Sequence, residues 1–190
     1  FPNETLQQIN STIDLARELR AHSNQFMTVL PYPGTKLFEE AKSNDLLMFP
    51  DDDLDKYDNR KCDYLKSDEW DSNKLREMSY DANIELNFLN NPCLESVEGR
   101  DYILRKYEDL LLTLPDHIIM HISVGYINKL KNNLVNYEKH CMIAAGLFKQ
   151  QPLYNTFNKY LSWDHNIIND FVEYLNANKK NSAKLIKYSL

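Results

Sequence analysis

Glycine and cysteine are scarce in this chain of 190 residues, and its basic residues, 22 lysines and arginines, are outnumbered by 28 acidic ones. Four glycines stand against twelve tyrosines and eight phenylalanines, which argues against an all-β, turn-rich design. The three cysteines, Cys62, Cys93 and Cys141, are odd in number and far apart, so they imply no disulfide framework. A net charge of −6 leaves no basic surface for a phosphate backbone and argues against nucleic acid as a partner.

Long apolar runs are also missing. No stretch approaches the roughly 20 apolar residues that a membrane span needs, and the start of the chain lacks the charged and apolar regions of a signal peptide. We therefore expect a soluble, cytoplasmic protein with no membrane span. The length is enough for one or two domains with a hydrophobic core.

The chain is organised around residues 26–35, which run on into residues 36–41. An apolar run rich in β-branched and aromatic residues ends at Pro31, a Pro-x-Pro-Gly turn follows, and Thr35 opens a segment with helical spacing. This pattern predicts a buried strand over residues 24–30, a rigid turn and a helix with a hydroxyl cap. The loop after such a strand is where ligands bind in folds of this kind.

A helix is predicted ahead of the strand. Thr5 and Gln8 have the spacing of a capping box, and apolar residues then recur at helical intervals from Leu6 to Leu19. Helix, strand and helix in succession imply a parallel sheet covered by helices.

These residues resemble the last third of the barrel of a radical S-adenosylmethionine (SAM) enzyme. The resemblance rests on Phe-Pro-Asn-Glu-Thr at residues 1–5, Pro-Tyr-Pro-Gly-Thr at 31–35 and the Leu-x-Glu-x-Ala helix that follows. It covers residues 1 to about 47 and is greatest to the subfamily that often carries an N-terminal cobalamin-binding domain. Asn3 stands where the family prefers glycine, the chain begins inside the motif without an initiator methionine, and no Cys-x-x-x-Cys-x-x-Cys is present.

The resemblance implies the C-terminal part of such an enzyme, with the rest of the barrel upstream or in another chain. In the family a [4Fe–4S] cluster binds SAM, which is cleaved reductively to a 5′-deoxyadenosyl radical, and cobalamin-dependent members also transfer methyl groups or rearrange substrates. It further implies that Leu30, Pro31 and Tyr32 lie beside the adenine of SAM, with Phe1 and Pro2 as weaker candidates. Strand-end packing is the competing interpretation for each of them. No residue of this chain is assigned a catalytic or metal-binding role.

Residues 48–71 are predicted to form an irregular linker or cap. Asp51, Asp53 and Asp55 alternate as in a calcium-binding loop, but Lys56 replaces the glycine and Cys62 the glutamate that such a loop requires. A solvated loop is the preferred interpretation.

Residues 72–190 are predicted to be helical. The first helix covers residues 72–89, with Asp71 or Ser72 as its cap. The stretch from about 97 to 152 resembles a tetratricopeptide (TPR) helical hairpin, with Val124-Gly125 where that repeat lets two helices touch. The expected fold class is therefore mainly α, with an N-terminal α/β piece of a partial TIM-type barrel over residues 1–47. The alternative function is a non-catalytic, TPR-like scaffold that binds a protein partner through the helical region.

Histidines offer the main candidate for a metal site. His117 and His121 are spaced i, i+4 and would share a helix face, as zinc ligands do, but Ile118 stands where zinc proteases have glutamate. We therefore expect packing or surface roles for both.

Overall fold

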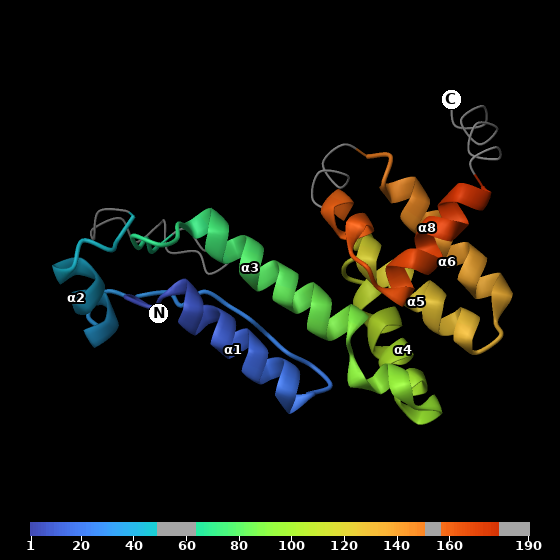
Figure 1. The fold of residues 1–190 in the computed structure, drawn as a ribbon, viewed down its shortest axis with the longest axis horizontal. Coiled ribbons are helices and arrows are strands. Elements are labelled where there is room, and N and C mark those ends of the chain that lie inside the picture. The colour runs from blue at the N-terminus through green and yellow to red at the C-terminus, as the bar shows by residue number, and fades with distance from the viewer. Residues whose placement is uncertain (49–63, 151–156, 179–190) are drawn as a thin grey trace. The chain divides into compact units, whose positions relative to one another are not determined.

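The computed structural model describes residues 1–48, 64–150 and 157–178 of the chain. These residues are mainly helical, as the sequence predicted, and none of them forms a strand (Figure 1). They divide into two compact units, Phe1–Asn87 and Phe88–Leu190. The aspartate-rich loop, Cys62 and the C-terminal tail lie outside the described residues. The barrel assignment of residues 1–47 and the boundaries drawn from the sequence stay predictions.

The first unit begins with α1 (Leu6–Leu19), whose N-terminus is the predicted capping box. The Thr5 hydroxyl accepts a hydrogen bond from the Gln8 amide at 3.2 Å, and the Gln8 side chain accepts one from the Thr5 amide at 2.8 Å. Ile13 is buried, whereas Leu19, which the periodicity placed on the apolar face, is exposed at the end of the helix. Both exchanged bonds are local, which is why the sequence alone could predict this end of α1.

The Pro-x-Pro-Gly turn leads into α2 (Lys36–Ser43). The Thr35 amide donates to the Tyr32 carbonyl at 3.1 Å, and Gly34 between them has a φ of 82°. A type II turn requires a positive φ at this position and favours proline just before it, where Pro33 stands. The Thr35 hydroxyl then accepts from the Phe38 amide at 3.2 Å, which confirms the predicted hydroxyl cap.

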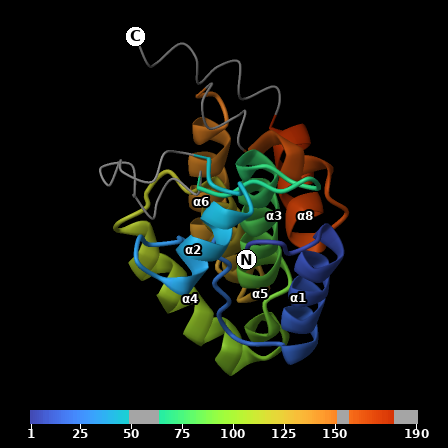
Figure 2. The same ribbon diagram turned by 90° about the vertical axis from the view of Figure 1, so that its left-hand side faces the viewer.

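Residues 24–30 have no partner strand within the described residues, so the expectation of a strand is not met there. The segment instead runs beside α3 (Ser72–Ile84), which continues as a π-helical turn over Glu85–Leu89. A strand needs a neighbouring backbone for its hydrogen bonds. Here side chains of the helix take the place of that backbone. In Figures 1 and 2, α1 and α3 lie side by side along this unit.

We call these side chains, Ser79, Asn83 and Asn87, the polar ladder. The Asn87 side chain accepts a hydrogen bond from the backbone N–H of Asn24 at 2.7 Å and donates one to the backbone carbonyl of Asn24 at 2.8 Å. Asn83 accepts from the Phe26 amide at 3.2 Å and donates to the Phe26 carbonyl at 3.1 Å. The Ser79 hydroxyl donates to the same carbonyl at 2.8 Å. The ladder therefore pairs both backbone groups of two residues in the extended segment.

A small hydrophobic core holds the other end of this unit. Ala41, Tyr64, Leu65 and Trp70 are buried together, and Val29 and Leu30 of the extended segment pack against them. An isolated bridge between Leu47 and Leu65 joins the two ends of the stretch that the structure does not describe. At the far end of α1, Arg17 forms two bonds of 2.8 and 2.7 Å with the Glu85 carboxylate.

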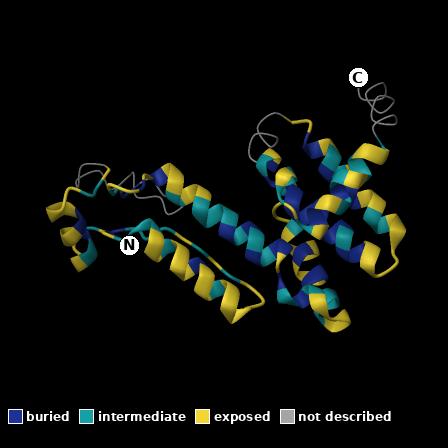
Figure 3. Cartoon of the chain, viewed as in Figure 1, coloured by how far each residue is buried: buried dark blue, intermediate teal, exposed yellow. Residues whose placement is uncertain are grey.

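The second unit is built around α5 (Ile118–Leu130). Ten of its thirteen residues are buried, in keeping with a helix that is apolar on nearly every face (Figure 3). It packs against α4 (Val97–Leu111), α6 (Leu134–Leu147) and α8 (Asn166–Ala177). Short 3₁₀ helices at Pro92–Glu95 and Asn158–Ser162 complete the unit.

The helices α5 and α6 form a hairpin, and Gly125 lies at their contact. A Cβ atom at Gly125 would stand 3.4 Å from the Cys141 sulfur and 3.5 Å from the Tyr137 carbonyl. The two helices therefore approach closely at the place where the sequence predicted it. Membership of this hairpin in a TPR-like array stays a prediction.

Two other glycines give a matched test of packing. A Cβ at Gly99 in α4 would lie 2.9 Å from the Cys93 Cα atom, whereas one at Gly146 in α6 would meet nothing within 4 Å. Gly99→Ala should lower the free energy of unfolding by roughly 1–3 kcal/mol, because backbone must move. Gly146→Ala should raise it by up to about 1 kcal/mol through helix propensity. Urea unfolding followed by circular dichroism measures both, and equal effects of the two substitutions would contradict the close contact at Gly99.

Candidate functional site

An apolar cavity of about 210 Å³ lies within the first unit. Its walls come from the start of the chain, α1, residues 26–29 and the first half of α3. The polar residues of its lining are Glu4, Thr12, Thr28 and Ser79. A concave, mainly apolar space with a few polar groups is the usual form of a small-molecule site. Its apolar lining includes Phe1, Ile13, Phe26, Val29, Trp70 and Met78.

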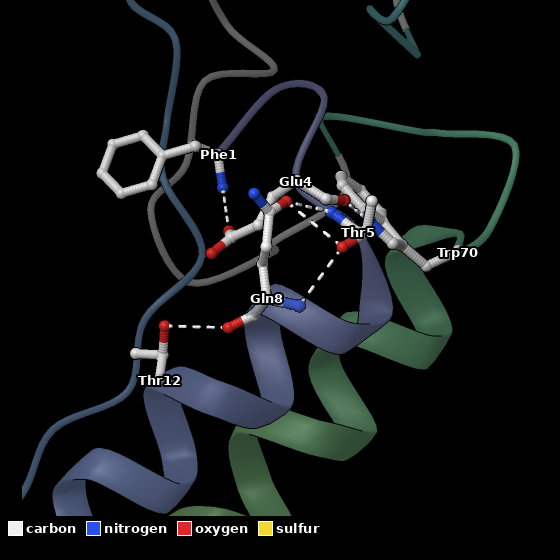
Figure 4. Close-up of polar contacts among 6 residues, drawn as sticks. All are labelled: Phe1, Glu4, Thr5, Gln8, Thr12 and Trp70. Carbon is white, nitrogen blue, oxygen red and sulfur yellow. Dashed lines mark hydrogen bonds and ion pairs between the residues drawn. The ribbon is translucent and has the colours of Figure 1, made fainter.

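The turn before α1 is fixed to Trp70 at the edge of this cavity (Figure 4). The buried Trp70 donates its indole N–H to the Glu4 carbonyl at 2.6 Å. The Glu4 carboxylate lies 2.6 Å from the backbone nitrogen of Phe1, and the Leu6 amide donates to Glu69 at 2.9 Å. Trp70 and Glu69 therefore hold residues 1–6 in place from a part of the chain more than 60 residues away.

Of the five residues that the resemblance placed near SAM, Phe1 lines the cavity, and it is 68% exposed. Pro2 is a buried residue of the turn itself. Leu30 is half-buried against the Trp70 core, and Pro31 is buried just beyond it. Tyr32 is 53% exposed. The structure thus brings Phe1 to the cavity and places Leu30, Pro31 and Tyr32 along the exit of the same segment, and their cofactor role stays a prediction.

The backbone at Tyr32 is already engaged. Its carbonyl accepts from both the amide and the hydroxyl of Thr35, at 3.1 and 2.7 Å. Proline at positions 31 and 33 supplies no backbone N–H. The C-terminal end of the extended segment, residues 30–33, therefore offers a ligand apolar and aromatic contact rather than a row of backbone donors.

Side chains suited to an iron–sulfur cluster do not come together in the described part of the chain. Cys93 and Cys141 are buried single thiols. Burial raises the pKa of Cys93 and raises that of Cys141 to about 12, which disfavours the thiolate that binds iron. Among the described residues, no group of three histidine, cysteine or carboxylate side chains is placed to hold a metal ion. This part of the chain does not fit a [4Fe–4S] cluster.

Histidines form a buried polar chain in the second unit. His121 and His140 bring their Nδ1 atoms to 2.9 Å, and His121 Nε2 lies 2.9 Å from the Pro115 carbonyl. A carbonyl only accepts, so His121 carries its proton on Nε2 and accepts at Nδ1 from the Nδ1–H of His140. His117 does not join them, because its Nδ1 accepts from the Met120 amide at 3.1 Å and caps α5. The spacing of His117 and His121 therefore serves capping and packing.

Burial sets the protonation of these histidines. It lowers the pKa of His117 to about 4 and that of His140 to about 4, and it lowers the pKa of His121 as well. The second contribution at His140 is the neighbouring His121. All three side chains are neutral at pH 7, as the hydrogen-bond pattern requires.

Sequence reasoning missed the polar ladder and the role of Trp70. The signal for the ladder was present, since positions 79, 83 and 87 are polar at intervals of four residues beside an apolar stripe. Nothing local to Trp70 marks its bond to Glu4, because the two residues are 66 positions apart.

Comparison with known proteins gives a partial likeness. No family model and no solved structure matches the chain. A stretch of 48 residues, 25% of the chain, is 44% identical to a protein of Pyrococcus horikoshii that is named an uncharacterized methyltransferase. That stretch covers 10% of the relative's length. The likeness is compatible with a relative among radical SAM or other methyltransferases. In addition, no helix of the described residues has the length and apolar character to cross a membrane.

The buried histidines predict a loss of stability in acid. In the unfolded chain each has a pKa near 6.5, so the unfolded state binds more protons between about pH 6.5 and 4, and stability falls as the pH is lowered through this window. At about 1.4 kcal/mol for each unit of pKa shift, His117 and His140 should each account for roughly 3 kcal/mol.

Urea unfolding at pH 7.5, 6.0 and 5.0 measures the part of this loss that falls above pH 5. His140→Gln keeps an amide N–H that can reach His121, so it should reduce the pH dependence while retaining the fold. Asn10→Gln, at an exposed position of α1, should leave the pH dependence as it is. A flat stability profile from pH 7.5 to 5.0 in the unchanged protein would contradict the neutral, buried pair.

Proposed function

We propose that residues 1 to about 47 are the C-terminal part of the barrel of a radical SAM enzyme that transfers a methyl group. The observation that carries the proposal is the 44% identity over 48 residues to a methyltransferase. The order of elements supports it, because an extended segment ends in a proline-fixed turn that leads directly into a capped helix. The chain spans a tenth of that relative, so the activity, the cluster and any cobalamin domain belong to the longer protein.

SAM is the ligand that we assign to the exit of the extended segment. When bound, SAM supplies the methyl group or the deoxyadenosyl radical. The apolar side chains of Leu30 and Pro31 and the half-exposed ring of Tyr32 suit contact with a flat purine. Phe1 and Pro2, at the turn held by Trp70, are the weaker candidates. The [4Fe–4S] cluster does not fit the described residues, so we assign its ligands, and cobalamin if it is used, to the upstream part.

The longer protein tests the proposal directly. We expect three closely spaced cysteines upstream, about four iron atoms per chain after reconstitution under reducing, oxygen-free conditions, and saturable binding of SAM. Absence of the cysteines or of SAM binding would overturn it.

The site assignment is tested by Leu30→Asp in the same longer protein. A carboxylate at this half-buried position costs several kcal/mol unless it is neutralised, and it would also face an apolar purine. We expect SAM affinity to fall by tenfold or more in protein that remains folded and retains its iron.

Leu15→Asp is the matched control, because it makes the same change at an exposed position of α1. It should bind SAM as the unchanged protein does. Unchanged SAM affinity in folded Leu30→Asp would remove this segment from the cofactor site while leaving the proposed enzyme class intact.

A further inference from the structure

The polar ladder contacts one edge of residues 24–30. In extended chain, the N–H and C=O of residues i and i+2 leave the backbone on the same side, and those of residue i+1 leave on the opposite side. The ladder binds the backbone groups of Asn24 and Phe26. The backbone groups of residues 25, 27 and 29 therefore face away from α3, on the second edge of the segment.

This second edge is open within the described part of the chain. None of the hydrogen bonds among the described residues involves the backbone of Gln25, Met27 or Val29. Gln25 is exposed and Met27 is 63% exposed. A row of unpaired N–H and C=O groups is a template for another strand, and proteins usually protect such an edge with charge, proline or a covering element. Residues 25–30 contain neither charge nor proline.

The two backbone edges of residues 24–30 thus differ in their hydrogen-bond partners. Five hydrogen bonds from three side chains close the edge toward α3. The opposite edge has no such partners among the described residues, while side chains of residues 26–29 and of Phe1 line the same cavity. The start of the chain therefore lies next to the segment that has the open edge.

We propose that the polar ladder of α3 ends the sheet, so that residues 24–30 accept one β-strand of the same enzyme, and only on the edge formed by residues 25, 27 and 29. The proposal rests on the proposed function, which supplies the rest of the barrel. It adds that the helix α3, rather than a further strand, closes the barrel sheet at its last member. Main-chain hydrogen bonds would provide the affinity for the added strand, and the apolar side chains of Phe26, Met27 and Val29 would provide its packing surface.

Amide hydrogen exchange measured by NMR on the 190-residue chain tests the asymmetry. The amides of Asn24 and Phe26 should be protected, and those of Gln25, Met27 and Val29 should exchange at rates close to those of unfolded peptide. Equal protection of both sets in dilute solution would overturn the proposal. Protection of residues 25, 27 and 29 that grows with protein concentration would assign the edge to a second copy of the chain and would also overturn it.

Substitution of the ladder tests its role. Asn83→Ala should reduce the protection of the Phe26 amide by about tenfold, the usual order for one lost hydrogen bond. Asn87→Ala should do the same for the Asn24 amide, and the milder Ser79→Ala should leave the protection of both amides largely intact. Asn10→Ala makes the same change on the exposed face of α1 and should alter neither. Unchanged protection in folded Asn83→Ala and Asn87→Ala would contradict the ladder.

The last experiment repeats the amide-exchange measurement in the longer protein. There the amides of residues 25, 27 and 29 should become protected, while those of 24 and 26 should stay dependent on Asn83 and Asn87. If SAM binds but the three amides remain exposed, the enzyme assignment stands and the edge proposal fails. If the amides are protected but SAM does not bind, the edge proposal stands and the proposed function fails.

Discussion

The backbone of an extended segment must find hydrogen-bond partners, and the first unit depends on how Asn24 and Phe26 find theirs. Leaving one buried backbone group unpaired costs roughly 1–3 kcal/mol. Three side chains of α3 satisfy the amide and carbonyl of two residues without a neighbouring strand. This pairing holds the extended segment against α3, and with it one wall of the cavity. Trp70 fixes the turn at the cavity's edge by its bond to Glu4.

The second unit solves the opposite problem, which is how a nearly wholly buried helix carries polar side chains. In α5 each finds a close partner: the Ser123 hydroxyl donates to the Ile119 carbonyl at 2.9 Å, and the Asn128 amide donates to the Val124 carbonyl at 2.9 Å. His121 lies between His140 and the Pro115 carbonyl. Because every one of these groups is paired, the helix retains apolar contact on its remaining faces without buried, unpaired polar atoms.

The parts that could be predicted from the sequence are those whose causes are local. The capping box at Thr5, the hydroxyl cap at Thr35 and the Asp71 cap of α3 each involve residues three apart. The extended conformation of residues 24–30 also follows from composition, but its pairing does not, because the partners lie near residue 83. An asparagine side chain on a helix can point into solvent as easily as toward the backbone of another segment. Its presence in the sequence therefore does not reveal what it binds. For the same reason the sequence around His121 gave no sign of its bond to His140.

The polar ladder has a limited length for a geometric reason. Four residues of α-helix advance about 6 Å along the axis, whereas two residues of extended chain advance about 6.6 Å. The two repeats nearly coincide over one step, so Asn87 and Asn83 meet Asn24 and Phe26 in turn. A difference of about 0.6 Å at each step would separate the two repeats only slowly. The ladder ends sooner because Ser79, one step further along α3, has a shorter side chain and donates to the Phe26 carbonyl that Asn83 already uses. Among the described residues, α3 therefore takes the place of a neighbouring strand for Asn24 and Phe26.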